Sequence, residues 1–265
     1  MNALIIAGGF SSRMGRDKAE IVRPDGVRQL DYLAGLVGRF CDEIWVSLRQ
    51  GGDLKTTLPV IEDRRPGLGP LAALEAAFLH RAGPWLVVAC DLFLLDEITI
   101  RQLIEQRDPT RLATAFRNRL DGRAEPLCAI YEIEGLVQVV NALDCRERGA
   151  RWFLESLEPQ LLALPNRLAL DNANTPEELA ECFAKLEYGV QRKSVELCIT
   201  AESSHTVEVQ TLACTLGGLF HEVRFLLRLR VELSEMEAYV NDICLPWETL
   251  ITTGIRVSIR KRMMG

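Results

Sequence analysis

The alternation of short apolar runs with helix-like segments through the first two thirds of the chain limits its possible folds most strongly. The apolar runs are Leu4 to Ala7, Ile44 to Leu48, Trp85 to Ala89 and Leu112 to Phe116. Short runs of this kind are typical of buried parallel strands. The segments between them, such as 30–40 and 71–81, have helical spacing and length. This βαβα order predicts an α/β fold with a Rossmann-like, open, mostly parallel sheet and helices on both faces.

A helix start near residue 175 indicates where this first domain ends. Thr175 is expected at the N-cap and Pro176 at the first helical position, with Glu178 completing a capping box. The helix would end at about Leu186. The segment 187–194 that follows is polar and has no clear periodicity, so we expect a domain boundary there.

The remaining part of the chain has a different pattern. Strand-like segments and one short helix are expected at 195–200, 206–212, 216–223 (the helix), 227–233, 236–250 and 254–259. These predict a small mixed α+β module. The expected domains are therefore an α/β domain at 1–188 and this module at 195–265.

Charge and composition exclude several classes of partner and location. With 31 basic and 37 acidic residues, a net charge of −6 and a pI near 5.3, no global positive field draws the chain to nucleic acid or anionic lipid. Its eight cysteines show no C-x-x-C pair or zinc spacing, which favours reduced thiols.

The N-terminal apolar run is too short for a signal peptide, and no stretch approaches the ~20 apolar residues of a membrane span. We expect a cytoplasmic protein with no nucleic-acid or membrane partner.

The loop after the first apolar run has features of a phosphate-binding loop. Gly8 and Gly9 let the backbone turn sharply and approach a phosphate, while Arg13 and Lys18 supply positive charge. The loop matches neither G-x-G-x-x-G nor the P-loop. An ordinary strand-to-helix connection is the alternative interpretation, but the full string favours a triphosphate.

Two aspartates are expected at the carboxyl edge of the sheet, where ligands bind in open α/β folds. Asp91 follows an apolar strand and is a candidate Mg²⁺ ligand, since Mg²⁺ prefers one or two carboxylates with phosphate oxygens and water. A helix N-cap is the alternative role. Asp63 and the turn containing Gly69 would form a neighbouring loop that opens a helix with free N–H groups. An ordinary surface turn is the alternative there.

Five ordered motifs resemble those of the molybdenum cofactor guanylyltransferases. Residues 6–18 match the signature L-A-G-G-x-S-x-R-M-G-x-D-K, with Ile6 at the leucine position. The other four are Asp63 with Gly69-Pro70-Leu71-Ala72, Cys90-Asp91, Glu125-Pro126-Leu127 before Tyr131, and Asn174-Thr175-Pro176-Glu177-Glu178-Leu179. The resemblance covers roughly residues 1–186.

This resemblance implies transfer of GMP from GTP to the terminal phosphate of molybdopterin, with Mg²⁺ as cofactor and without a protein nucleophile. It implies catalytic roles for Arg13, Lys18 and Asp91, with Asp91 as the metal ligand. The implied nucleotide-binding residues are Ile6, Ala7, Gly8, Gly9, Lys18, Asp63, Gly69 and Asp91.

Two departures from the family pattern keep alternatives open. Leu48 stands where the family often has an asparagine, and leucine cannot supply that amide's paired donor and acceptor. Phe93 stands at the proline of the C-D-x-P segment. A CTP-using molybdopterin cytidylyltransferase or a related nucleotidyltransferase is one alternative. A nucleotide-binding scaffold or sulfur-carrier protein is the other.

The C-terminal module weakly resembles the ubiquitin-like β-grasp sulfur carriers of molybdopterin synthesis. The similarity lies in its size, element order and the segments 238–250 and 254–259. Those carriers end in a thin Gly-Gly tail, whereas this chain ends in Gly265 preceded by two methionines. Docking on a molybdopterin synthase subunit or assembly factor, or pairing of two protomers, is therefore favoured over sulfur transfer.

Overall fold

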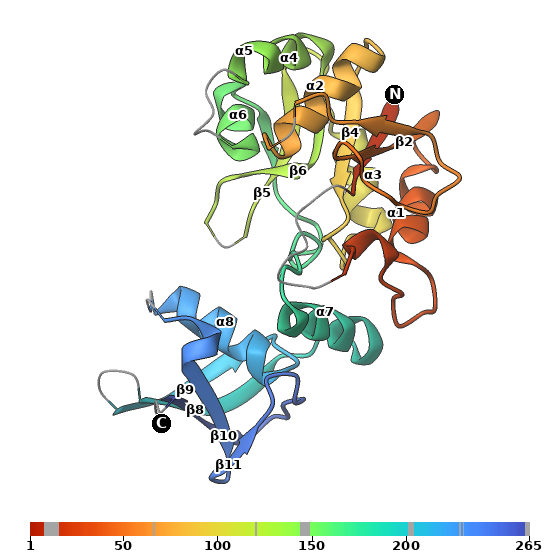
Figure 1. Cartoon of the computed structure of the whole chain (residues 1–265). Helices are drawn as coiled ribbons and strands as arrows, with labels where there is room; N and C mark the ends of the chain where they lie inside the picture. Colours follow the sequence, from red (N-terminus) through yellow and green to blue (C-terminus); the bar gives the residue numbers. More distant parts are fainter. Residues whose placement is uncertain are drawn as a thin grey trace. The chain divides into compact units, whose positions relative to one another are not determined.

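The computed structural model of the chain describes residues 1–7, 16–65, 67–119, 121–143, 149–200, 204–227, 229 and 231–262 (Figure 1). It divides into two compact units, Met1–Asn172 and Ala173–Gly265. The division precedes helix α7 (Pro176–Tyr188), so this helix groups with the second unit. From the sequence alone, this helix is expected in the first domain, 1–188.

The first unit is built on a sheet with the strand order β3-β2-β1-β4-β6-β5-β7. Its strands are β1 (Asn2–Ile6), β2 (Glu43–Leu48), β3 (Val60–Glu62), β4 (Trp85–Ala89), β5 (Ala113–Arg117), β6 (Ala124–Tyr131) and β7 (Gln160–Leu162). Its helices are α1 (Gln29–Val37), α2 (Pro70–His80), α3 (Glu97–Glu105), α4 (Ile133–Val137), α5 (Val139–Ala142) and α6 (Ala150–Ser156). Strand β6 is antiparallel to β4 and β5, and the other neighbours are parallel. This confirms the predicted mostly parallel α/β sheet.

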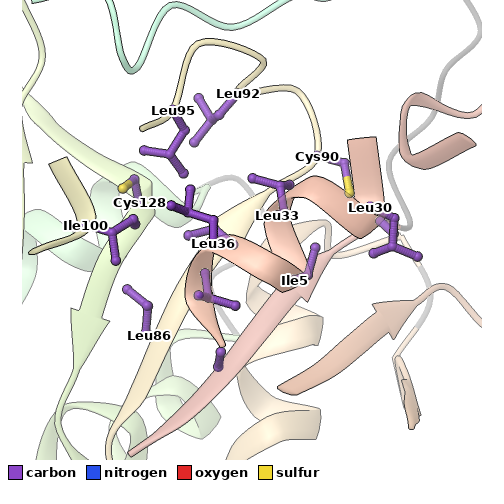
Figure 2. Close-up of a cluster of buried hydrophobic side chains, with 14 of the residues drawn as sticks. Ile5, Leu30, Leu33, Leu36, Leu86, Cys90, Leu92, Leu95, Ile100 and Cys128 are labelled. Carbon is purple, nitrogen blue, oxygen red and sulfur yellow. The ribbon is translucent and has the colours of Figure 1, made fainter. Parts of the chain in front are cut away.

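Alternate residues of the strands face two apolar clusters, one on each side of the sheet. Ile5 of β1 is fully buried in a cluster with α1 and α3, whereas Leu4 lies in the cluster with α2, α4, α5 and α6. Figure 2 shows Leu33 of α1 close to the sheet and Leu92, from the loop after β4, in the same cluster. Because both faces are covered, the strands are apolar throughout.

Strand β6 carries a bulge where it begins. The register shifts between Ala115, which pairs with Ala129, and Arg117, which pairs with Ala124. Over this stretch β6 has more residues than β5, and Pro126 lies among them. Proline has no N–H for a ladder, so within a central strand it is tolerated at a bulge. The same proline explains why the sequence did not predict this strand.

The second unit combines α7 with a further sheet in the order β11-β10-β12-β8-β9. Its other elements are β8 (Lys193–Thr200), β9 (Ser204–Thr211), α8 (Leu216–Leu226), the 3-10 helix η2 (Leu233–Glu235), β10 (Met236–Val240), β11 (Ile243–Leu245) and β12 (Ile255–Lys261). Strands β8 and β12 are parallel, and the other pairs are antiparallel. This is the small α+β module that the sequence predicted, while its relationship to sulfur carriers stays a prediction.

The segment 236–250, expected to hold one strand, contains both β10 and β11. Asn241 and Asp242 join them with φ angles of 52° and 63°. Two central residues with positive φ fit the right-handed twist of a hairpin, and Asn and Asp tolerate that conformation best after glycine. The turn therefore divides the expected strand in two.

A buried carboxylate attaches α7 to the residues just before α8, including its N-cap Thr215. Glu181 accepts hydrogen bonds from the N–H groups of Cys214 at 2.9 Å and Thr215 at 2.7 Å, and from the Thr215 hydroxyl at 2.8 Å. Lys185 Nζ lies 3.1 Å from Glu181 and is equally buried. A Cβ at Gly218 would come within 2.4 Å of this carboxylate. These contacts explain why α7 belongs to the second unit.

No helix within the described residues is long and apolar enough to cross a membrane. The cytoplasmic location stays a prediction.

We predict that Glu181→Ala destabilises the second unit by about 3 to 5 kcal/mol, because it removes the carboxylate beside the buried Lys185 ammonium and the acceptor of the Cys214 and Thr215 N–H groups. Hydrogen exchange of α8 amides under increasing urea would measure this. Glu187→Ala, on an exposed position of the same helix, is the control and should stay within about 0.5 kcal/mol of wild type. Equal exchange in both variants would contradict the role given to Glu181.

Candidate active site

The carboxyl ends of parallel strands bring predicted site residues to one edge of the first unit's sheet. Ile6 ends β1, and Ala7 follows it and donates its N–H to the Ser47 carbonyl of β2 at 3.0 Å. Asp63 directly follows β3, and Asp91 follows β4. The structure therefore places these residues at the edge where open α/β sheets bind ligands.

Lys18 and Asp91 meet at this edge. Lys18 Nζ lies 3.6 Å from Asp91 Oδ2, and the two side chains are 16% and 17% exposed. Lys18 begins the 3-10 helix η1 (Lys18–Glu20), where the Asp17 carboxylate accepts the Ala19 N–H at 2.9 Å. Ala19 is fully buried and anchors this turn in the core. A cation and a carboxylate are thus held close together, with part of each open to a ligand.

The Asp91 carboxylate suits a hard divalent cation such as Mg²⁺. Within the described ranges, no group of three His, Cys, Asp or Glu side chains could hold a metal ion by itself. A single carboxylate fits a magnesium site whose remaining ligands are phosphate oxygens and water. Such a site depends on the nucleotide being bound.

The loop after Asp91 is fixed by side chains from α1 and the segment before it. Arg23 donates to the Phe93 carbonyl at 2.7 Å and to Gln29 Oε1 at 2.9 Å. Gln29 Nε2 donates to the Leu92 carbonyl at 3.3 Å. Arg23 and Gln29 are both buried, so these bonds are shielded from water.

Tyr32 adds two contacts to this network. Its hydroxyl donates to the Leu95 carbonyl at 2.8 Å, and the Arg23 guanidinium stacks over its ring at 3.6 Å. The family's proline would stiffen this loop through its fixed φ. Here, hydrogen bonds to successive carbonyls hold the loop that carries Phe93 at the proline position. The sequence did not reveal these residues, because they lie more than 60 positions from the carbonyls they bind.

Leu48, at the position where the family often has asparagine, is buried in the core. Its side chain packs in the cluster with α1 and is 5% exposed. It therefore offers a nucleotide neither a polar group nor an exposed surface, and any choice of base must come from other residues.

Asp63 is a half-buried carboxyl with one side-chain hydrogen bond, from Ser47 Oγ at 3.2 Å. Burial raises the pKa of Asp63 to about 6, and the Ser47 bond offsets this only partly. Its backbone N–H donates to the Leu48 carbonyl at 2.8 Å, which holds it at the end of β3. A carboxylate held this way can accept hydrogen bonds from a nucleotide.

Gly69 is the N-cap of α2, with φ 59° and ψ −144°. Side-chain-bearing residues rarely adopt this conformation, so the turn requires glycine. Pro70 follows at the first helical position, where its missing N–H costs nothing. Pro70 has no N–H and the Ala72 N–H already donates to the Gly69 carbonyl at 3.0 Å, so the start of this helix offers an anion few N–H groups.

Glu125 was matched to a family motif in the sequence but given no role. It lies at the start of β6, 8% exposed, and accepts from Asn118 Nδ2 at 3.2 Å. Burial raises its pKa, and the negative charge of Asp91 adds to that rise. A second buried carboxyl therefore lies near the Lys18–Asp91 pair.

The remaining predicted site residues, Gly8, Gly9 and Arg13, lie outside the described residues.

Comparisons with known proteins find similar sequences for the first two thirds of the chain. A family model described as a MobA-like NTP transferase domain matches residues 3–161. A "molybdenum cofactor biosynthesis bifunctional protein" of Synechocystis sp. is 30% identical over 183 residues, which are 67% of this chain but only 52% of that protein. A "probable molybdenum cofactor guanylyltransferase" of Mycobacterium ulcerans is 32% identical over 182 residues, or 66% of this chain and 90% of the relative.

A solved structure shares the fold. The crystal structure of molybdopterin-guanine dinucleotide biosynthesis protein A from Archaeoglobus fulgidus superposes with a TM-score of 0.60 and 21% identity. The match covers 71% of this chain and all of that one.

We predict that nucleotide affinity depends on pH through Asp63. Because the pKa of Asp63 is raised to about 6, its ionised, accepting form becomes populated as pH rises through that value. Affinity should rise about tenfold between pH 5 and pH 7, following the ionised fraction of such a group. Titration calorimetry with a nucleoside triphosphate would measure it.

The control for this pH dependence is Asp63→Asn, which keeps the shape but cannot ionise. The ligand's own phosphate titration is common to both proteins, so the difference between their pH profiles isolates Asp63. Identical profiles would rule out contact between Asp63 and the nucleotide. In the free protein, pH affects folding stability in the opposite direction to nucleotide affinity. Ionisation of this half-buried carboxyl lowers the free energy of unfolding as pH rises from about 4 through about 6.

Proposed function

Because the chain belongs to the MobA-like NTP transferase family, we propose that it transfers GMP from GTP to the terminal phosphate of molybdenum-molybdopterin. The products are molybdopterin guanine dinucleotide and pyrophosphate. The proposal draws on the guanylyltransferase named among its relatives and, within the chain, chiefly on the Lys18–Asp91 pair.

The reaction needs positioning and charge rather than a protein nucleophile. A terminal phosphate oxygen of the acceptor attacks the α-phosphorus of GTP, and the bond from that phosphorus to the pyrophosphate oxygen breaks. Lys18 donates to the phosphate oxygens as negative charge builds on the leaving group. Arg13, in the glycine-rich loop, is proposed to act beside it. The partial burial of Lys18 strengthens its electrostatic effect.

Transferases of this family use a divalent metal ion, and we propose Mg²⁺ with Asp91 as its protein ligand. When bound, the ion would neutralise charge on the phosphates and help to align them. The carbonyl bonds from Arg23 and Gln29 position the Asp91 loop for this role.

The nucleotide is proposed to lie along the β1 and β3 side of the edge. Its phosphates would meet Gly8, Gly9 and Lys18, with Ile6 and Ala7 lining the entrance to the loop. Asp63 and Gly69 would contact the nucleoside, and Asp63 offers an acceptor for the ring N–H and amino group of guanine. A CTP-using transferase is the alternative, since buried Leu48 gives no selectivity for either base.

The second unit is proposed to dock on a molybdopterin synthase subunit or assembly factor, or to pair two protomers. The side of its sheet away from α8 carries paired charges, such as Arg256 with Glu196 and Arg262 with Glu237. Exposed charge pairs stabilise a complex weakly but favour particular partners. A sulfur carrier would instead gain the mass of a sulfur atom on its terminal carboxylate in the cell, which mass spectrometry detects.

We predict that Lys18→Ala lowers the rate of pyrophosphate release about 10²- to 10³-fold, because it removes a cation that stabilises the transition state. Turnover would be measured with GTP, Mg²⁺ and molybdopterin under saturating conditions. Lys55→Ala, an exposed lysine of the same unit, is the matched control and should keep the wild-type rate. Wild-type turnover by Lys18→Ala would contradict the proposed function.

A further inference from the structure

The bulge at the start of β6 is fixed from within the strand. The Tyr131 hydroxyl donates to the Pro126 carbonyl at 3.0 Å, and both groups are buried. Bulges redirect neighbouring side chains, and they are frequent beside active sites. Glu125 lies within this bulge, beyond Cys128, which pairs with Val88 near the carboxyl end of β4.

The Glu125 carboxylate is held by weak or neutral donors rather than by a close ion pair. Asn118 Nδ2 lies at 3.2 Å and Arg151 at 3.5 Å, both on Oε2. The Leu127 N–H reaches Oε1 at 3.4 Å. Arg151 makes its shorter bond, 2.9 Å, to Asp121. A carboxylate has about four acceptor sites, so Oε1 in particular keeps capacity for a further donor.

A buried carboxylate of this kind is costly for the fold. Taking it out of water is disfavoured unless a close cation compensates, and here the nearest guanidinium contact is long. The side chain of Glu125 is nevertheless 11% exposed. Folding stability thus does not explain why a carboxylate occupies this position, whereas recognition of a ligand does.

The sheet order places Glu125 on the acceptor side of the proposed reaction. The residues proposed for the nucleotide follow β1 and β3, and Asp91 follows β4. Strand β6 is the next strand beyond β4. In-line transfer places the attacking oxygen opposite the leaving pyrophosphate. With the nucleotide on the β1 side, the acceptor approaches from the β6 side.

Resting on the proposed function, we propose that Glu125 recognises the pterin of the acceptor through its 2-aminopyrimidinone edge. That edge carries a ring N–H and an amino group side by side. The amino group can donate to Oε1, and the ring N–H can donate to Oε2, where the Arg151 contact of 3.5 Å is long. Asn118 and Arg151 act as positioning residues that fix Oε2. Guanine presents the same edge, so the test separates the pterin from the nucleotide.

The Glu125→Gln variant gives a sharp test, because it exchanges one acceptor for a donor. Asn118 and Arg151 both donate to Oε2, so the amide oxygen of the glutamine should take that position. The glutamine would then present its NH₂ group at the Oε1 position. This group repels the amino group of a pterin but pairs with the carbonyl of the 2-oxo analogue, a 2,4-dioxopteridine. The variant should bind pterin about 10- to 100-fold more weakly, from the loss of charge-assisted hydrogen bonds. It should also reverse the preference between the two compounds.

The measurement is titration calorimetry of the full chain with pterin, with 2,4-dioxopteridine and, separately, with GTP and Mg²⁺. The expected result is reversed pteridine preference with unchanged GTP affinity. The matched control is Glu155→Gln, which should behave as wild type. Glu155 lies on helix α6, and its carboxylate pairs with Arg123. A parallel loss of affinity for both pteridines would indicate a structural role and overturn the proposal.

Other outcomes are equally decisive. Weaker GTP binding by Glu125→Gln would assign the carboxylate to guanine, and the absence of pterin binding by the wild type would also overturn the proposal. Failure of the proposed function would be seen differently. The wild-type protein would then bind pterin but form no dinucleotide. In a working enzyme, Glu125→Gln should raise the KM for molybdopterin with little change in the KM for GTP.

Discussion

The parallel pairing of β1 with β4 determines the geometry of the candidate active site. Their register runs from Asn2 opposite Trp85 to Ile6 opposite Ala89, so the two strands end side by side. The chain that follows β1 returns at Lys18, and the chain that follows β4 continues into Asp91. This adjacency places a lysine and an aspartate 3.6 Å apart although they are far apart in sequence. The proposed phosphate and metal chemistry depends on that contact.

The sequence predicted the parts of this arrangement that have a local signal. Strands such as Trp85–Ala89 are continuous apolar runs, and Asp91 comes two residues after the end of this one. Strand β6 was not predicted because Pro126 interrupts its pattern, and a bulge absorbs that proline only in the folded sheet. Likewise, the Arg23 bond to the Phe93 carbonyl joins residues 70 positions apart. No periodicity or motif encodes such a contact.

The grouping of α7 with the second unit has the same explanation. Its N-cap was predictable, and Thr175 does accept the Glu178 N–H at 3.3 Å. Its packing was not, because Glu181 binds backbone groups more than 30 residues away. The helix carries the last of the family-like motifs, yet its buried carboxylate belongs to the second unit. Local sequence thus predicted the element, and tertiary contacts decided its partner.

The central claim is that this chain joins a guanine nucleotide to molybdopterin. Mass spectrometry of the product formed with Mg²⁺, molybdopterin cofactor and equal concentrations of GTP and CTP tests it most directly. The account predicts molybdopterin guanine dinucleotide, with one pyrophosphate released for each product formed. A cytosine dinucleotide, or no product while the acceptor remains intact, would contradict it.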